Sequence, residues 1–257
     1  MFDKSLFKDK VILISGATGG VGQATAECLF NCNASLSLTG TNVEKLSALS
    51  ERFNAHTIVA DIAKVDNCER IIAETLTKYG RIDALVNCAG VWVQGDSEFA
   101  EEKDWDHCLN VNLKGPFFLS SRAIPALKAS QGSIINVGSD AGVIGNAGAA
   151  IYCASKGGLT VMSKSLAMEL APFGIRVNVI CPADIMSPML QGQAAQYGGN
   201  DPDGYLTKLL DHYPQGHHAR FITPDEVAHL IVFLLTQKAC PITGAAINMD
   251  FGLSAGY

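Results

Sequence analysis

A glycine-rich turn near the amino terminus is the feature that most constrains how this chain can fold. It follows a short apolar run at residues 11–15 and precedes a segment with helical periodicity. Gly16, Gly20 and Gly22 form the pattern G-x-x-x-G-x-G within the turn. A strand, a glycine-rich turn and a helix in succession place backbone amides where they can bind a diphosphate. An ordinary flexible loop is the alternative interpretation of the turn.

Further apolar runs alternate with helical patterns along the rest of the chain. The runs that we predict to be strands, after residues 11–15, are 35–39, 57–61, 84–86, 133–137, 175–180 and 245–249. Predicted helices follow the glycine turn, open at Asn42 and Thr223, and cover residues 66–79, 102–128 and 152–170. This alternation predicts an α/β, Rossmann-type doubly wound fold: a seven-stranded parallel sheet with helices on both faces.

The bulk composition indicates one globular domain over residues 1–257. The chain is 48% hydrophobic and 17% charged, and it contains no repeat or linker that would mark a boundary. Residues 190–220 are rich in Gly, Gln, Asp, Tyr and His and show little regular patterning, so we predict a substrate loop at about 184–220.

Charge and targeting signals exclude several classes of function. The net charge is −6 and the basic residues do not cluster, so no nucleic-acid partner is expected. The first residues lack the layout of a signal peptide, and no apolar run is long enough to span a bilayer. We therefore expect a cytoplasmic protein with no membrane partner.

The cysteines and histidines do not form a recognisable metal motif. The 8 cysteines are scattered through apolar segments without a C-x-x-C pair, so we interpret them as reduced and mostly buried. His212, His217 and His218 fall in one loop with no cysteine nearby in sequence. A zinc site is the alternative, but surface or substrate-loop histidines fit the pattern better, and we predict no metal.

Tyr152 and Lys156 lie four residues apart at the head of a predicted helix. This spacing puts both side chains on one helix face. An ammonium group near a phenol lowers the pKa of the phenol, which is about 10 when free, and so allows proton exchange with an alcohol or a ketone. The spacing also arises by chance, so the pair gains meaning only from its surroundings.

Other polar and small residues lie where strands of the predicted sheet end. Ser139 follows the strand at 133–137 and precedes Tyr152 across a loop of small residues. The segment Asn87–Gly90 follows the strand at 84–86, and small residues there let the backbone approach a ligand closely. Asn112 lies inside the predicted helix 102–128, where asparagine is unfavourable, which indicates a specific hydrogen-bonding task.

Together these motifs, in this order, resemble the short-chain dehydrogenase/reductase family in its single-domain form of about 250 residues. The resemblance covers essentially the whole chain. It rests on the glycine turn, Asp61, Asn87-Cys88-Ala89-Gly90, Asn112, Ser139, Tyr152-x-x-x-Lys156, the segment from Pro182 to Ser187, and Asp250-Phe251-Gly252. The chain departs from the family pattern at Cys88, Ala183 and Phe251, where Asn, Gly and Gly are usual.

The resemblance implies a role for each catalytic position. Tyr152 would be the general acid/base, and Lys156 would lower its pKa and hold the nicotinamide ribose. Ser139 would bind the substrate oxygen. Asn112 would hold a water molecule that links Lys156 to solvent. Ile185 and Ser187 would fix the nicotinamide amide.

The resemblance also implies a dinucleotide cofactor, NAD or NADP. The residues expected to bind it are Gly16, Thr18, Gly19, Gly20, Val21, Gly22, Thr41, Asp61, Ile62, Asn87, Ala89, Gly90, Tyr152, Lys156, Pro182, Ile185 and Ser187. The second strand ends in Gly40-Thr41, without the acidic residue typical of NAD enzymes. No basic residue is available there or at Thr18 for a 2′-phosphate, so the sequence favours NAD.

We therefore predict an NAD(P)-dependent oxidoreductase that interconverts a secondary alcohol and a ketone. A 3-oxoacyl carrier-protein reductase is the main alternative, although Lys103, Lys114 and Arg122 form no clear basic patch for an acidic carrier. A non-catalytic dinucleotide sensor is a further alternative, but such relatives usually lose the tyrosine or the lysine.

The substrate is a small molecule whose identity the sequence leaves open. Residues near the motifs that could contact it are Ser139, Trp92, Met186 and Tyr197, with Val93, Asp140, Ala141, Met189 and Leu190 as further candidates. The resemblance also implies a homo-oligomer, a tetramer or a dimer, assembled through the helices at 102–128 and 152–170.

Overall fold

The computed structural model of the chain describes residues 2–256, and its centre is one parallel sheet. The strand order is β3-β2-β1-β4-β5-β6-β7. The strands are β1 Val11–Ser15, β2 Ser35–Gly40, β3 His56–Val59, β4 Ala84–Asn87, β5 Ser133–Val137, β6 Arg176–Pro182 and β7 Ala246–Met249. All six pairings are parallel, which confirms the predicted Rossmann-type fold.

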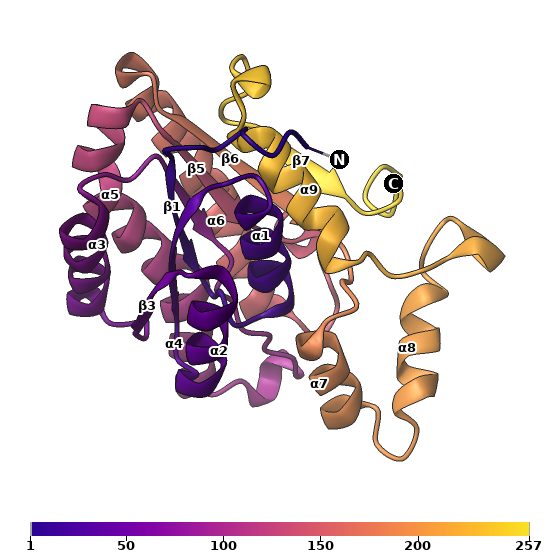
Figure 1. Cartoon of the computed structure of the whole chain (residues 1–257). Helices are drawn as coiled ribbons and strands as arrows, with labels where there is room; N and C mark the ends of the chain where they lie inside the picture. The colour runs from indigo at the N-terminus through magenta and orange to yellow at the C-terminus, as the bar shows by residue number, and fades with distance from the viewer. Residues whose placement is uncertain (1, 257) are drawn as a thin grey trace.

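Helices cover both faces of the sheet (Figure 1). They are α1 Gly20–Phe30, α2 Val43–Phe53, α3 Val65–Tyr79, α4 Glu102–Leu109, α5 Gly115–Ser130, α6 Ala150–Leu170, α7 Pro188–Tyr197, α8 Pro202–Leu210 and α9 Pro224–Leu235. None of the helices within residues 2–256 has the length and hydropathy that crossing a bilayer requires.

Two apolar layers hold the helices to the sheet. One contains side chains of α1, α2 and α9, such as Leu29, Leu46 and Ile231, and the other contains side chains of α3, α5 and α6, such as Ile71 and Leu119. Strands β1, β4, β5 and β6 are buried along nearly their whole length because both faces of the sheet are covered, which explains their largely hydrophobic sequences.

Local capping agrees with the sequence at two helix starts. The Asn42 side chain accepts a hydrogen bond from the Lys45 amide (2.8 Å) at the start of α2. At α9, Thr223 and Glu226 form a reciprocal capping box, with the Glu226 carboxylate accepting from the Thr223 amide at 2.9 Å. Both predicted helix starts are therefore confirmed, with Asn42 and Thr223 as the N-cap residues.

Two predicted boundaries were wrong. The expected single helix at 102–128 is α4 and α5 joined by a π-helical turn, Asn110–Lys114. The segment expected to be irregular at 190–220 contains α7 and α8, which project from the body of the molecule (Figure 1). Ser187 and Asp201 cap these two helices, and each is followed by a proline, a pattern typical of a helix start.

The sheet topology places the functional region. The strand order reverses between β1 and β4, and ligands of doubly wound folds bind in the crevice outside the carboxyl ends of the strands at this point. Asp61, predicted at the end of the third strand, lies just beyond β3 in the loop at the same edge of the sheet.

Candidate active site

The glycine turn packs tightly against the loop after β4. Gly16 has a φ of +67°, and a Cβ there would lie 2.5 Å from the Ala89 amide nitrogen. A Cβ at Gly22 would lie 2.3 Å from the Gly16 carbonyl oxygen. Glycine is therefore required at both positions, and the turn delivers the start of α1 to the carboxyl edge of the sheet. No side chain caps α1, so its first amides stay available for an anion.

A cavity of about 910 Å³ extends from this turn along the carboxyl edge of the sheet. It contains most of the predicted cofactor-binding positions. Those that line it are Gly16, Thr18, Gly19, Gly20, Val21, Gly22, Thr41, Asp61, Ile62, Ala89, Gly90, Tyr152, Lys156, Pro182, Ile185 and Ser187. The glycine turn, the uncapped helix start and this cavity together fit a dinucleotide.

Asn87 is the exception among the predicted cofactor positions. Its side chain lies below the cavity, 1% exposed, and its amide nitrogen donates to Asn136 Oδ1 at 2.8 Å and to Ser120 Oγ at 3.2 Å. Its oxygen accepts from Ser15 Oγ at 3.2 Å. Asn87 thus links strands β1, β4 and β5 and does not line the cavity. The neighbouring Ala89 and Gly90 line the cavity instead.

Tyr152, Lys156 and Ser139 all line this cavity. Helix α6 presents the first two, and Ser139 follows β5. The Lys156 ammonium lies 5.8 Å from the centroid of the Tyr152 ring and donates to the Val137 carbonyl at 2.9 Å. The Trp92 ring packs on the Tyr152 ring, with 4.5 Å between the ring centroids and an angle of 57° between the ring planes.

Burial dominates the electrostatics of this pair. It raises the pKa of Tyr152, a change that the Ser139 hydroxyl opposes and the charge of Asp140 reinforces. Burial also lowers the pKa of Lys156 to about 8. The net shift of the Tyr152 pKa is therefore upward, opposite to the lowering expected from Lys156, because desolvation of the phenolate is the largest cause.

Asn112 lies in the π-helical turn and is fully buried. Its oxygen accepts from the Val91 amide at 2.8 Å, and its nitrogen donates to the Val91 carbonyl at 2.9 Å and to Ser155 Oγ at 3.1 Å. The side chain thus joins the loop after β4 to the start of α6. π-Helical turns are frequent at functional sites, and this one gives the asparagine the specific hydrogen-bonding task that the sequence indicated.

The substrate end of the cavity differs from the predicted one. Trp92, Asp140, Met189 and Leu190 line it, whereas Met186, Tyr197, Val93 and Ala141 do not. Met186 was predicted to contact substrate, but its side chain is 37% exposed. Tyr197 ends α7 away from the cavity, because the segment expected to be an irregular loop is helical there.

Several cavity residues escaped the sequence interpretation. They are Gln94, Tyr205, Tyr213 and Asp184, whereas His212, expected on the surface or in the substrate loop, also lines the cavity. Gln94 Oε1 accepts from Trp92 Nε1 (3.1 Å) and from the Tyr205 hydroxyl (3.2 Å), which ties α8 to the loop after β4. No local pattern indicates contacts between residues this far apart in the sequence.

Metal-binding geometry is missing from the part of the chain that the structure describes. Residues 2–256 contain no group of three or more His, Cys, Asp or Glu side chains that could hold a metal ion. His212 lines the cavity, and His217 and His218 stack on each other, with 3.9 Å between ring centroids. All eight cysteines are free, and four of them are buried: Cys32, Cys68, Cys108 and Cys181.

Comparison with known proteins identifies the class of protein that this fold and cavity define. Residues 10–198 match the family described as short chain dehydrogenase. The chain is 35% identical over 250 residues to the 3-oxoacyl-(acyl-carrier-protein) reductase FabG of Thermotoga maritima, which covers 95% of this chain and 97% of that protein. It is 34% identical over 255 residues to the NAD-dependent glycerol dehydrogenase of Listeria innocua, with 98% and 96% covered.

Solved structures agree with this result. The crystal structure of levodione reductase superposes with a TM-score of 0.92 at 28% identity, covering 98% of this chain and 100% of that one. The chain therefore belongs to the short-chain dehydrogenase/reductase family. It is an NAD(P)-dependent oxidoreductase that acts on alcohols and ketones.

Proposed function

We propose that the protein interconverts a secondary alcohol and a ketone by hydride transfer, with Tyr152 as the general acid/base and NAD as the preferred cofactor. The observation that supports this is the meeting of Ser139, Tyr152 and Lys156 in one cavity with the glycine turn. The cofactor, when bound, supplies or accepts the hydride.

The residues of the chain direct the proton. In ketone reduction, Tyr152 gives its hydroxyl proton to the substrate oxygen while the carbonyl carbon gains the hydride; in alcohol oxidation, the phenolate takes that proton back. Ser139 orients the substrate oxygen. Lys156 stabilises the phenolate, and Asn112 supports the route by which the tyrosine proton is exchanged with solvent.

The preference for NAD rests on the end of β2. The space above Gly40 is filled by Thr18, since a Cβ at position 40 would lie 3.1 Å from Thr18 Oγ1. Lys156 is the one Lys or Arg side chain among the cavity-lining residues within 2–256, and it lies beside Tyr152. A 2′-phosphate would therefore lack a cationic partner near Thr41. The similarity to an NAD-dependent dehydrogenase supports the same choice.

Two measurements test this function. Titration of the protein with NADH and with NADPH should show tighter binding of NADH. A screen of secondary alcohols and ketones, followed by nicotinamide absorbance, should then show turnover with the tighter cofactor. Tight binding without turnover on a broad panel would instead support a non-catalytic sensor.

A 3-oxoacyl carrier-protein reductase is the second candidate, because the FabG relative is 35% identical. The basic side chains on the 102–128 segment offer it little support: Lys103 is paired with Glu101 at 2.8 Å, and Arg122 is paired with Glu69 at 2.9 Å. Efficient reduction of a 3-oxoacyl thioester on its carrier, with weak turnover of small ketones, would favour this candidate.

We also propose a homo-oligomer, a tetramer or a dimer, that assembles through α4, α5 and α6. These helices expose large apolar side chains, among them Trp105 (46% exposed), Val161 (66%) and Met168 (81%). Light scattering of the purified protein tests the assembly.

We further propose that the protein works in a reducing compartment such as the cytoplasm, which its eight free cysteines support.

A further inference from the structure

Two carboxylates, those of Asp140 and Asp184, line the same cavity as Ser139 and Tyr152. Asp140 follows Ser139 directly after β5, and Asp184 follows the end of β6. They are close enough for the charge of Asp140 to raise the pKa of Asp184. The proposed mechanism uses neither of them.

Each carboxylate is held by one oxygen only. Asp140 Oδ1 accepts from Ser139 Oγ and from the Ala141 amide, both at 2.8 Å. Asp184 Oδ2 accepts from the Tyr213 hydroxyl at 3.1 Å, and the Asp184 amide donates to the same hydroxyl at 3.0 Å. Within residues 2–256, Asp140 Oδ2 and Asp184 Oδ1 have no hydrogen-bond partner. The held oxygens fix both side chains and leave an acceptor on each for a ligand.

The charges and polar groups that line the cavity near Asp140 and Asp184 indicate which ligand the two open carboxylate oxygens would bind. Lys156 is the one Lys or Arg side chain that lines the cavity within the described residues, and it lies beside Tyr152. His107 and His212 are the other lining groups that can carry a positive charge, so an anionic substrate would meet two carboxylates with no Lys or Arg set aside to compensate them. The neighbouring polar groups of Gln94, Tyr205 and His212 can both donate and accept hydrogen bonds. A neutral group that donates to a carboxylate and also accepts fits this end best.

We infer that Asp184, together with Asp140, is a specificity-determining residue that binds a second hydroxyl of the substrate, so that the substrate is a neutral vicinal diol or polyol. This inference rests on the proposed function. A hydroxyl on the carbon next to the reacting carbinol would reach the open carboxylate oxygens while Ser139 and Tyr152 hold the reacting oxygen.

Burial raises the pKa of Asp184 to about 6, with Asp140 adding to the shift and the Tyr213 hydroxyl opposing it. The carboxylate is therefore ionised at neutral pH, but weakly so. A substrate hydroxyl would stabilise the Asp184 carboxylate through a hydrogen bond, and a substrate ammonium would do so through its charge. A diol and an amino alcohol therefore have to be compared.

The test compares four alcohols with the same secondary carbinol: 2-propanol, propane-1,2-diol, 1-amino-2-propanol and lactate. We expect kcat/KM of the wild-type enzyme to be at least about tenfold higher for the diol than for 2-propanol, from one hydrogen bond to a charged acceptor. Lactate should be the poorest of the four. Cyclohexanol and cyclohexane-1,2-diol provide a second pair with a larger apolar body.

Asp184→Asn should reduce the ratio of diol to monoalcohol kcat/KM by about tenfold. Tyr213→Phe removes the hydroxyl that donates to Asp184 Oδ2, and it should reduce the same diol-to-monoalcohol ratio by a smaller factor. Asp203→Asn is the matched control: it also removes one carboxylate, but from an exposed position on α8 outside the cavity, and it should leave the ratio unchanged.

Three results would overturn the inference: no diol preference in the wild type, a ratio that Asp184→Asn leaves intact, or a stronger preference for the amino alcohol than for the diol. Failure of the proposed function looks different, because then the wild type would turn over none of these alcohols. If the monoalcohols react, Tyr152→Phe does not, and the diol has no advantage, only the present inference is wrong.

Discussion

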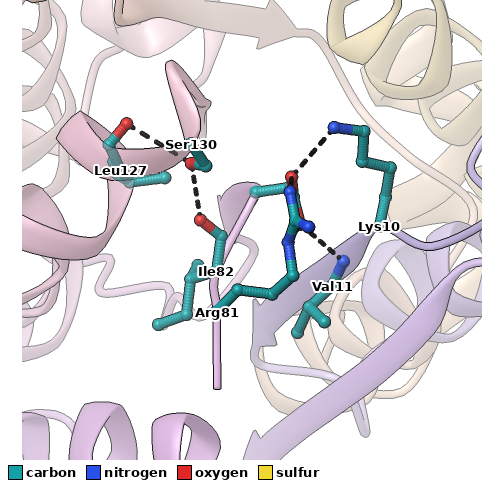
Figure 2. A network of polar contacts seen from close by, with 7 residues as sticks. Lys10, Val11, Arg81, Ile82, Leu127 and Ser130 are labelled. Carbon is teal, nitrogen blue, oxygen red and sulfur yellow. Dashed lines mark hydrogen bonds and ion pairs between the residues drawn. The ribbon is translucent and has the colours of Figure 1, made fainter. Parts of the chain in front are cut away.

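Carboxylates at the two ends of the sheet differ in how fully their oxygens are hydrogen-bonded: Asp83 at the amino end is buried, whereas Asp140 and Asp184 at the carboxyl end are half-buried. At the amino end, Asp83 precedes β4 and accepts from the Val11 amide (2.9 Å), Lys10 Nζ (3.1 Å) and the Arg81 guanidinium (2.7 and 2.8 Å). Figure 2 shows the donors Lys10, Val11 and Arg81 of this network side by side. At the carboxyl end, Asp140 and Asp184 each leave one oxygen without a partner among the described residues.

The pKa shifts follow this difference. Burial alone would raise the pKa of Asp83, but the hydrogen bonds from Arg81, Val11 and Lys10 lower it overall. Burial prevails at Asp184 and raises the pKa to about 6, and it lowers the pKa of Lys156 to about 8. The amino end thus has fixed charges that stabilise the fold, whereas the carboxyl end keeps groups that change protonation near neutral pH.

The largest effect expected at the carboxyl end is that of Tyr152→Phe. The loss of the phenol should reduce kcat by about 10³-fold or more, since general acid/base catalysis contributes up to about 10⁴. NADH binding should stay nearly intact. Steady-state kinetics and a cofactor titration measure both quantities, and wild-type rates in the variant would rule out Tyr152 as the acid/base.

At the amino end, the largest expected effect is on stability. Asp83→Ala should lower the free energy of unfolding by about 2–4 kcal/mol, because it leaves the Val11 amide and two cations without their buried acceptor. Lys10 and Arg81 are nearly half exposed, so solvent screens their share. Denaturant unfolding measures the change, with the exposed Glu51→Ala as control.

The stabilisation that Asp83 provides should also depend on pH. Because the folded pKa of Asp83 is lowered, its contribution is present above the pKa of an unfolded aspartate, about 4, and is lost as pH falls through the folded pKa. The gap between wild type and Asp83→Ala should therefore close in acid. Unchanged NADH affinity is expected, since the cavity lies at the other end of the sheet.

A smaller effect on kcat/KM is expected from deprotonation of Lys156. In ketone reduction its ammonium stabilises the tyrosinate that forms, and it loses its proton as pH rises through about 8. The kcat/KM for reduction should therefore fall above that pH, by up to about tenfold per unit. Lys156→Arg keeps its charge and should move this decline to higher pH, whatever its absolute rate. An unchanged profile in the arginine variant would show that another group sets the decline.

The smallest expected effect is that of Asp184→Asn on the free energy of unfolding, and its sign is opposite to that of Asp83→Ala. Asp184→Asn should raise the free energy of unfolding at neutral pH by about 1 kcal/mol, because a raised carboxyl pKa means that the ionised form opposes folding. The advantage should shrink as pH falls through about 6 and the wild-type carboxyl becomes protonated. Asp203→Asn should change neither value; a destabilised Asp184→Asn would show that this carboxylate is structural.

The sequence was sufficient for the sheet and for the core of the site. The continuous apolar strands, the glycine turn and the serine, tyrosine and lysine all follow local rules that a single sequence displays. The π-helical turn was missed because no local pattern marks it, and the Asn112 side chain that it carries bonds to Val91, 21 positions earlier in the sequence. Helix α8 was missed because weak periodicity hid it, although Asp201 followed by Pro202 marks its start.

The substrate end was harder to predict for the same reason. Gln94 and Tyr205 are joined by a hydrogen bond across 111 positions of sequence, and Tyr213 reaches Asp184 across 29. Adjacency to a motif therefore selected Met186 and Tyr197 and overlooked the residues that the fold brings together.

The packing of Trp92 on Tyr152 gives the protein an optical probe of its own site. The chain has only two tryptophans, and Trp105 is a half-exposed surface residue. A Trp105→Phe protein would emit from Trp92 alone, a few ångströms from the phenol that exchanges the proton. Its emission would then report cofactor arrival, the ionisation of the tyrosine and the loss of the Gln94 hydrogen bonds that join Trp92 to Tyr205 of α8, without any added label.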